Sequence, residues 1–135
     1  MTVQTIQIQL PAEIYQHLQR VADATHQPLE AVVFQTIRGN LPPSLDDLSP
    51  DLQHVVVDLQ PLSDEVLWVI AKAPLPPQQW RRHQYLLAQA QAGLLSAAEE
   101  TELADLRAAT DRYVTRRSYA LALLKWRGHT IPAEL

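Results

Sequence analysis

Polar and apolar residues alternate from Thr5 to Leu10 within residues 2–10, which read Thr-Val-Gln-Thr-Ile-Gln-Ile-Gln-Leu. Successive side chains of a β-strand point to opposite faces, so this pattern predicts a strand that ends at Pro11. One face of that strand would carry three apolar side chains, those of Ile6, Ile8 and Leu10. The opposite face would carry three polar side chains, those of Thr5, Gln7 and Gln9.

Two helical patterns follow this strand, one after Pro11 and one between Pro28 and Gly39. In each, apolar residues recur at spacings of three and four, which is typical of a helix with one buried face. The apolar positions are Ile14, Leu18, Val21 and Ala22 in the first pattern and Leu29, Val32, Val33 and Ile37 in the second. A lone strand has two open edges and cannot bury its apolar face by itself. The order strand, helix, helix therefore predicts a dimer in which two copies of the strand pair as a ribbon.

The chain resembles the ribbon-helix-helix family of repressors and antitoxins in residues 5–11, in Ile14, Leu18 and Ala22, and in residues 29–33. The resemblance implies a homodimer whose outward strand side chains enter the major groove of DNA, which admits a two-stranded ribbon. Carried over by position, the DNA-reading side chains are Thr5, Gln7 and Gln9, and the dimer core is formed by Ile6, Ile8 and Leu10. The glutamine amide suits this role because it can hydrogen-bond both N6 and N7 of adenine. A polar strand face that is simply solvated is an equally open interpretation of the same three residues.

Two features depart from the family pattern. The family commonly has glycine between the helices and a serine or threonine cap on the second helix, where this chain has His26 and Pro28. Residues 1–40 also hold only two arginines against three acidic residues, although phosphate neutralisation supplies most non-specific DNA affinity. These departures favour a second hypothesis, a protein-interaction adaptor that uses the ribbon only for dimerisation. A third hypothesis is that residues 3–10 pair within one α+β domain and leave the chain monomeric.

Residues 41–50 contain three prolines, which predicts a connector, and residues 51–135 are predicted to be entirely helical. Short helices are expected after Ser49 and after Ser63. The second of these is apolar on most sides around Trp68, so it should be buried or contact a partner.

The clearest helical pattern is a hairpin formed by residues 78–92 and 97–127. Ser96 and Glu99 match a capping box, and neither glycine nor proline interrupts the chain from there until Gly128. The turn at residues 93–96 is short, which makes the two helices antiparallel neighbours. This C-terminal half also resembles small uncharacterised bacterial proteins, a resemblance that implies a recurring module and no particular activity.

Composition narrows the chemistry of the chain. It has 135 residues and a formal net charge of −4. It has no cysteine, which excludes disulfides and zinc sites built on thiolates. Its five histidines lack a metal-binding spacing, and its three glycines cannot build a nucleotide-binding loop. No run of eighteen or more apolar residues is present. We therefore expect a cytoplasmic protein that is not an enzyme and has no catalytic residues, no metal, no cofactor and no membrane contact.

The leading hypothesis from the sequence is a mostly α-helical homodimer with a ribbon-helix-helix N-terminus, acting as a DNA-binding transcription regulator or an antitoxin-like protein. Its expected partners are a second copy, operator DNA, and a toxin or other protein. The residues expected to contact a protein partner are Trp68, Trp80, Arg116 and Arg117.

Overall fold

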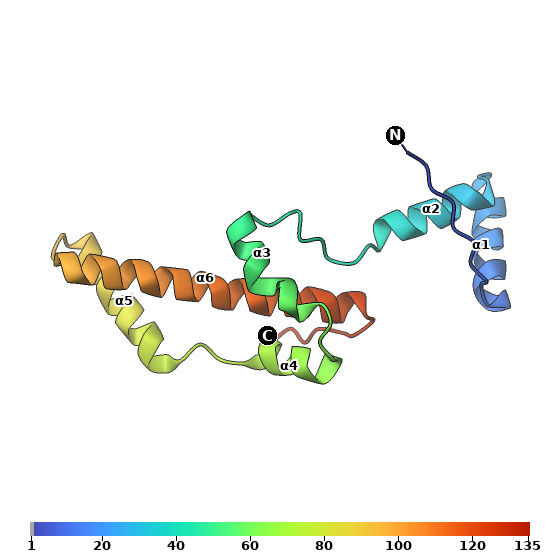
Figure 1. Ribbon diagram of the computed structural model, residues 1–135. Coiled ribbons are helices and arrows are strands. Elements are labelled where there is room, and N and C mark those ends of the chain that lie inside the picture. The colour runs from blue at the N-terminus through green and yellow to red at the C-terminus, as the bar shows by residue number, and fades with distance from the viewer. Residues whose placement is uncertain (1) are drawn as a thin grey trace. The chain divides into compact units, whose positions relative to one another are not determined.

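The computed structural model describes residues 2–135 and contains six α-helices and one 3-10 helix over that range (Figure 1). The chain divides into two compact units between Leu41 and Pro42. The first unit holds helices α1 and α2, and the second holds the remaining elements, α3 to α6 with the 3-10 helix η1.

The N-terminal unit is a pair of helices, α1 (Ala12–Thr25) and α2 (Leu29–Gly39), each preceded directly by a proline. Proline suits the entry to a helix because its φ angle is already helical and it lacks the N–H that would remain unsatisfied. Helix α1 ends at His26, which adopts the left-handed conformation (φ 54°, ψ 41°), and the next amide donates to the carbonyl of Ala22 at 3.0 Å. Both helices therefore lie where the periodicity predicts them.

The predicted strand, and with it the ribbon-helix-helix N-terminus, is wrong. No strand occurs anywhere in residues 2–135, and all of residues 2–10 are exposed, with Ile6 82% and Ile8 60% accessible. The alternating pattern states which side chains would share a face, but a strand also needs a neighbouring strand to accept and donate its backbone hydrogen bonds. No other segment of residues 2–135 supplies one, so residues 2–10 have no secondary structure.

The second unit is built along α6 (Ala97–Trp126), a helix of 30 residues that spans about 45 Å at the standard rise. It starts at the predicted capping box, in which the Ser96 and Glu99 side chains each bond the other's backbone N–H at 3.1 Å. The preceding turn is closed by Gly93, whose φ of 72° is strained for any residue with a side chain. Helix α5 (Pro77–Gln91) precedes that turn and packs on the N-terminal half of α6.

The main core lies at the other end of α6, where α3 (Pro50–Val56), η1 (Val57–Leu59) and α4 (Asp64–Lys72) pack against it. Its buried members are Val56, Leu59, Leu67, Ala71, Tyr119, Ala120, Leu123 and Leu124. Burying one leucine side chain completely contributes about 1.5–3 kcal/mol, so this cluster is the principal source of stability in the unit. Across the described residues, no helix combines the length and the apolar character that crossing a bilayer requires.

A candidate protein-interaction groove

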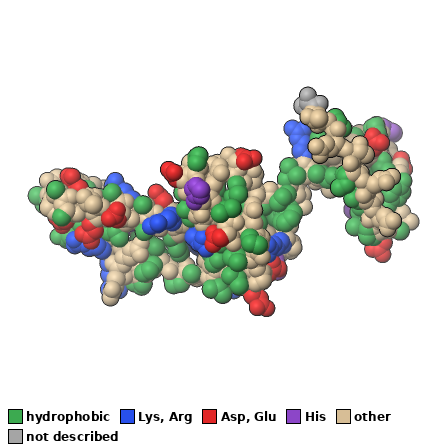
Figure 2. All heavy atoms as spheres, in the orientation of Figure 1, with side chains coloured by type: hydrophobic (Ala, Val, Ile, Leu, Met, Phe, Trp, Pro, Cys, Tyr) green, Lys and Arg blue, Asp and Glu red, His purple; other side chains and the backbone are tan. Residues whose placement is uncertain are grey.

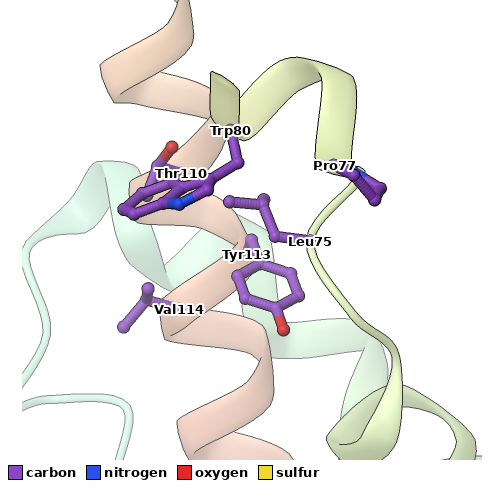
Figure 3. A pocket seen from close by; sticks show the side chains of 6 residues that line it. All are labelled: Leu75, Pro77, Trp80, Thr110, Tyr113 and Val114. Carbon is purple, nitrogen blue, oxygen red and sulfur yellow. The ribbon is translucent and has the colours of Figure 1, made fainter. Parts of the chain in front are cut away.

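An open apolar groove of about 510 Å³ lies between α5, the connector before it and the middle of α6 (Figure 3). We call it the Trp80 groove. Its lining is Leu75, Pro77, Trp80, Thr110, Tyr113 and Val114. Trp80 is 45% exposed and Val114 is 50% exposed, so large apolar side chains face solvent here. Aromatic side chains that line a pocket in this way are typical anchors of protein recognition.

The connector that forms one wall is held in place by Tyr113. Its hydroxyl donates to the carbonyl of Ala73 at 2.7 Å, directly after α4 ends. Prolines at 74, 76 and 77 then keep the chain extended, because the residue before a proline is displaced from the helical region. Leu75 consequently reaches over α6 beside the rings of Trp80 and Tyr113 (Figure 3).

Trp80 is positioned by the buried side chain of His83. The two rings meet edge to face, with centroids 5.9 Å apart and planes at 89°. His83 is only 7% exposed, and its Nδ1 lies 3.3 Å from the hydroxyl of Thr110 on α6. A buried ring nitrogen needs such a partner, so this contact fixes the histidine and through it the tryptophan.

An exposed ion pair fastens α5 to the first turns of α6. Arg82 donates two hydrogen bonds to Glu102, at 2.7 and 2.8 Å. These bonds lower the pKa of Glu102 and raise the pKa of Arg82. Since both groups are solvated, the ion pair adds little to the free energy of unfolding, and its main effect is to fix the position of α5 on α6.

A second, smaller hollow of about 300 Å³ continues along α6 and shares Val114 with the Trp80 groove. Its other lining residues are Leu48, Thr115, Ser118, Tyr119 and Ala122. Helix positions from Thr110 to Ala122 span roughly 18 Å at the standard rise. Together the two hollows can therefore receive about three turns of a partner helix.

The structure places the four predicted partner-binding residues in different surroundings. Trp80 lines the groove, whereas Trp68 packs beside the main core, edge to face with His129 and 5.1 Å from the Lys72 ammonium.

Both arginines of that prediction are held within the protein. Arg116 donates to the carbonyl of Val55 at 2.6 Å and pairs with Asp58 at 2.9 Å, which lowers the pKa of Asp58. Arg117 donates to the carbonyl of Ala71 at 3.2 Å. The Arg116 contacts join α6 to α3 and η1, and the Arg117 contact joins α6 to α4.

The residues predicted to read DNA and to form the dimer core all lie in the exposed segment before Pro11. Thr5, Gln7 and Gln9 are exposed, and so are Ile6, Ile8 and Leu10, so a single chain does not separate the two sets by burial. That these three polar residues read DNA remains a prediction. The strand on which that prediction was based does not occur in residues 2–135. Among the residues that the structure describes, no three of the types His, Cys, Asp and Glu are grouped so that they could hold a metal ion.

The sequence did not identify Leu75, Thr110, Tyr113 and Val114 as parts of a surface site. One signal was present: Thr110 interrupts the apolar spacing of α6 just where His83 from α5 meets it. Comparisons with protein families, curated proteins and solved structures found no match to this chain, so neither resemblance proposed from the sequence has support there.

Proposed function

We propose that this protein is a self-associating interaction adaptor. Two copies join through the apolar surface of the N-terminal unit, and the helical unit of each copy presents the Trp80 groove to another protein. The observation that carries this proposal is the imbalance between buried and exposed apolar residues in the N-terminal unit.

Only Ala22 and Val32 are buried within residues 2–41. The large apolar side chains that remain exposed there are Val3, Ile6, Ile8, Leu10, Ile14, Tyr15, Val21, Phe34, Ile37 and Leu41. Hydrophobic side chains, drawn in green, form part of the visible face of this unit (Figure 2). Chains of about 40 residues seldom fold stably without a metal, disulfides or oligomerisation, and this chain has no cysteine.

A second copy fits this surface in area and in charge. Complete burial of a Val, Leu or Ile side chain removes roughly 60–120 Å² of apolar surface from water, and each Å² contributes about 25 cal/mol. Ten partly exposed side chains therefore amount to several hundred Å² of apolar surface. A standard interface buries about 800 Å² per partner, which is of the same order. The segment carries two basic and three acidic residues, so two copies repel each other little. A symmetric pair needs only this one surface.

Sedimentation analysis of the full chain over a range of concentrations tests the proposal. The wild type should have twice the chain mass of 15.2 kDa. The Phe34→Asp variant and the Ile6→Asp/Ile8→Asp variant should sediment as monomers and should lose at most the helix content of α1 and α2. The matched control is Gln7→Asp/Gln9→Asp, which adds the same charges to the same segment and should stay dimeric. A monomeric wild type, or a dimer that survives all of these changes, would overturn the proposal.

A further inference from the structure

We infer that the Trp80 groove binds an acidic amphipathic helix of a partner protein, with an apolar side chain seated beside Trp80 and carboxylates near Arg81 and Arg107. This inference rests on the proposed adaptor function and gives the chemistry of its partner.

Positive charge lies close to the groove along both helices. Two exposed arginines are near its lining residues in the sequence: Arg81 follows Trp80 directly on α5, and Arg107 lies one turn before Thr110 on α6. Neither forms an ion pair with a carboxylate among residues 2–135, although Arg82, Arg116 and Arg127 do. Asp111 is the acidic residue on the neighbouring part of α6. Unpaired guanidinium groups beside an apolar pocket favour a ligand that supplies carboxylates.

The apolar surface extends along α6 beyond the Trp80 groove. The Trp80 groove and the smaller hollow meet at Val114 and follow α6 over about three helical turns. Beyond Val114, three of the lining side chains are short, those of Thr115, Ser118 and Ala122, and these let a partner backbone approach α6 closely. Recognition of a helix in such a groove uses apolar anchors at spacings of three and four residues.

The charges also orient the partner helix. Asp46 and Asp47 adjoin Leu48, which lines the smaller hollow at the far end from Trp80. Carboxylates of the partner would be repelled there and attracted at the arginine end. We therefore expect its acidic residues to lie near the anchor that contacts Trp80.

A random library of 16-residue displayed peptides, selected on the full-length chain, tests this inference. Enriched peptides should share apolar residues at three- and four-residue spacing together with several Asp or Glu residues near one end. A labelled consensus peptide should lose at least about tenfold in affinity with Val114→Glu, because the new charge is placed in the apolar groove. The matched control is Val69→Glu, an exposed valine on α4 outside the groove, which should bind as the wild type does.

The charge contribution is tested by reversal. The Arg81→Glu/Arg107→Glu variant should bind the acidic consensus peptide several-fold more weakly, and a peptide with lysines in place of its acids should recover affinity for that variant. The inference is overturned if no peptide is enriched, if enriched peptides lack carboxylates, or if Val114→Glu does not weaken them. It is also overturned if random-sequence duplex DNA binds and responds to the arginine reversal but not to Val114→Glu. If peptides without carboxylates bind the groove, this inference fails but the adaptor function does not. Self-association of the adaptor is tested separately, by sedimentation.

Discussion

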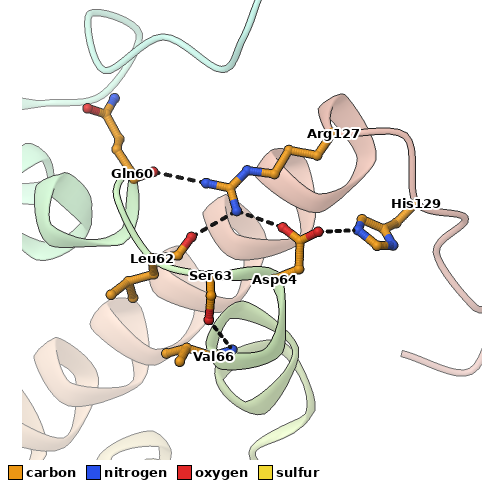
Figure 4. A network of polar contacts seen from close by, with 7 residues as sticks. All are labelled: Gln60, Leu62, Ser63, Asp64, Val66, Arg127 and His129. Carbon is orange, nitrogen blue, oxygen red and sulfur yellow. Dashed lines mark hydrogen bonds and ion pairs between the residues drawn. The ribbon is translucent and has the colours of Figure 1, made fainter.

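Arg127 at the C-terminal end of α6 forms an ion pair with Asp64 at the start of α4, with Nη1 and Oδ1 2.7 Å apart (Figure 4). The same guanidinium donates to the carbonyls of Leu62 at 2.8 Å and Gln60 at 3.0 Å. The other Asp64 oxygen lies 2.7 Å from Nε2 of His129. The Arg127 guanidinium thus joins the end of α6 to the loop before α4, and the Asp64 carboxylate joins the start of α4 to Arg127 and His129.

Because of this network, the free energy of unfolding should decrease as the pH is lowered. The hydrogen bond from Arg127, followed by that with His129, holds the pKa of Asp64 below its ordinary value. A carboxyl group with a lower pKa in the folded state stabilises the fold above its unfolded pKa and loses that contribution as the pH falls through the folded value. We expect Asp64→Asn to destabilise the protein at about pH 5, with the difference from wild type shrinking towards about pH 2.5. Urea unfolding across this range measures it.

The control for this prediction is Asp105→Asn, at an exposed position on α6 away from the network. The difference in the free energy of unfolding between this variant and the wild type should not decline as the pH is lowered. A stability difference for Asp64→Asn that is the same at every pH would contradict the assigned role of the ion pair.

The contact between His83 and Thr110 should couple α5 to α6. Thr110→Val leaves a ring nitrogen of buried His83 unpaired and should lower the free energy of unfolding by about 1–3 kcal/mol. When His83→Leu is added, the second loss should be smaller, because no unpaired nitrogen remains. A double-mutant cycle by urea unfolding should give a coupling of about 0.5–3 kcal/mol. Additivity within about 0.5 kcal/mol would show that the contact does not link the helices.

The left-handed conformation of His26 predicts a stabilising substitution. A side chain costs about 1–2 kcal/mol in that conformation and glycine avoids most of this, so His26→Gly should protect α1 by about 0.5–1 kcal/mol. Native-state hydrogen exchange of the α1 amides measures the change. His17→Gly, within the same helix, is the matched control and should instead cost about 0.3–0.5 kcal/mol. Equal effects of the two glycines would rule out strain at His26.

Local patterns in the sequence determined most helix boundaries, because caps and prolines act within a few residues. Pro11 and Pro28 mark the entries to α1 and α2, and the Ser96–Glu99 capping box marks the start of α6. The same local reading predicted a strand before Pro11 that the structure lacks, since alternation describes one segment while a strand requires two.

Only the tertiary structure decided which exposed residues act together. Trp80 and Arg116 look alike as candidate contacts in the sequence, yet Trp80 lines a groove while Arg116 is held by Val55 and Asp58. The groove itself exists because α5 packs on α6 and because Tyr113 holds the preceding connector at Ala73. Such contacts join residues that are 20 to 40 positions apart, and their geometry depends on packing that no local spacing specifies.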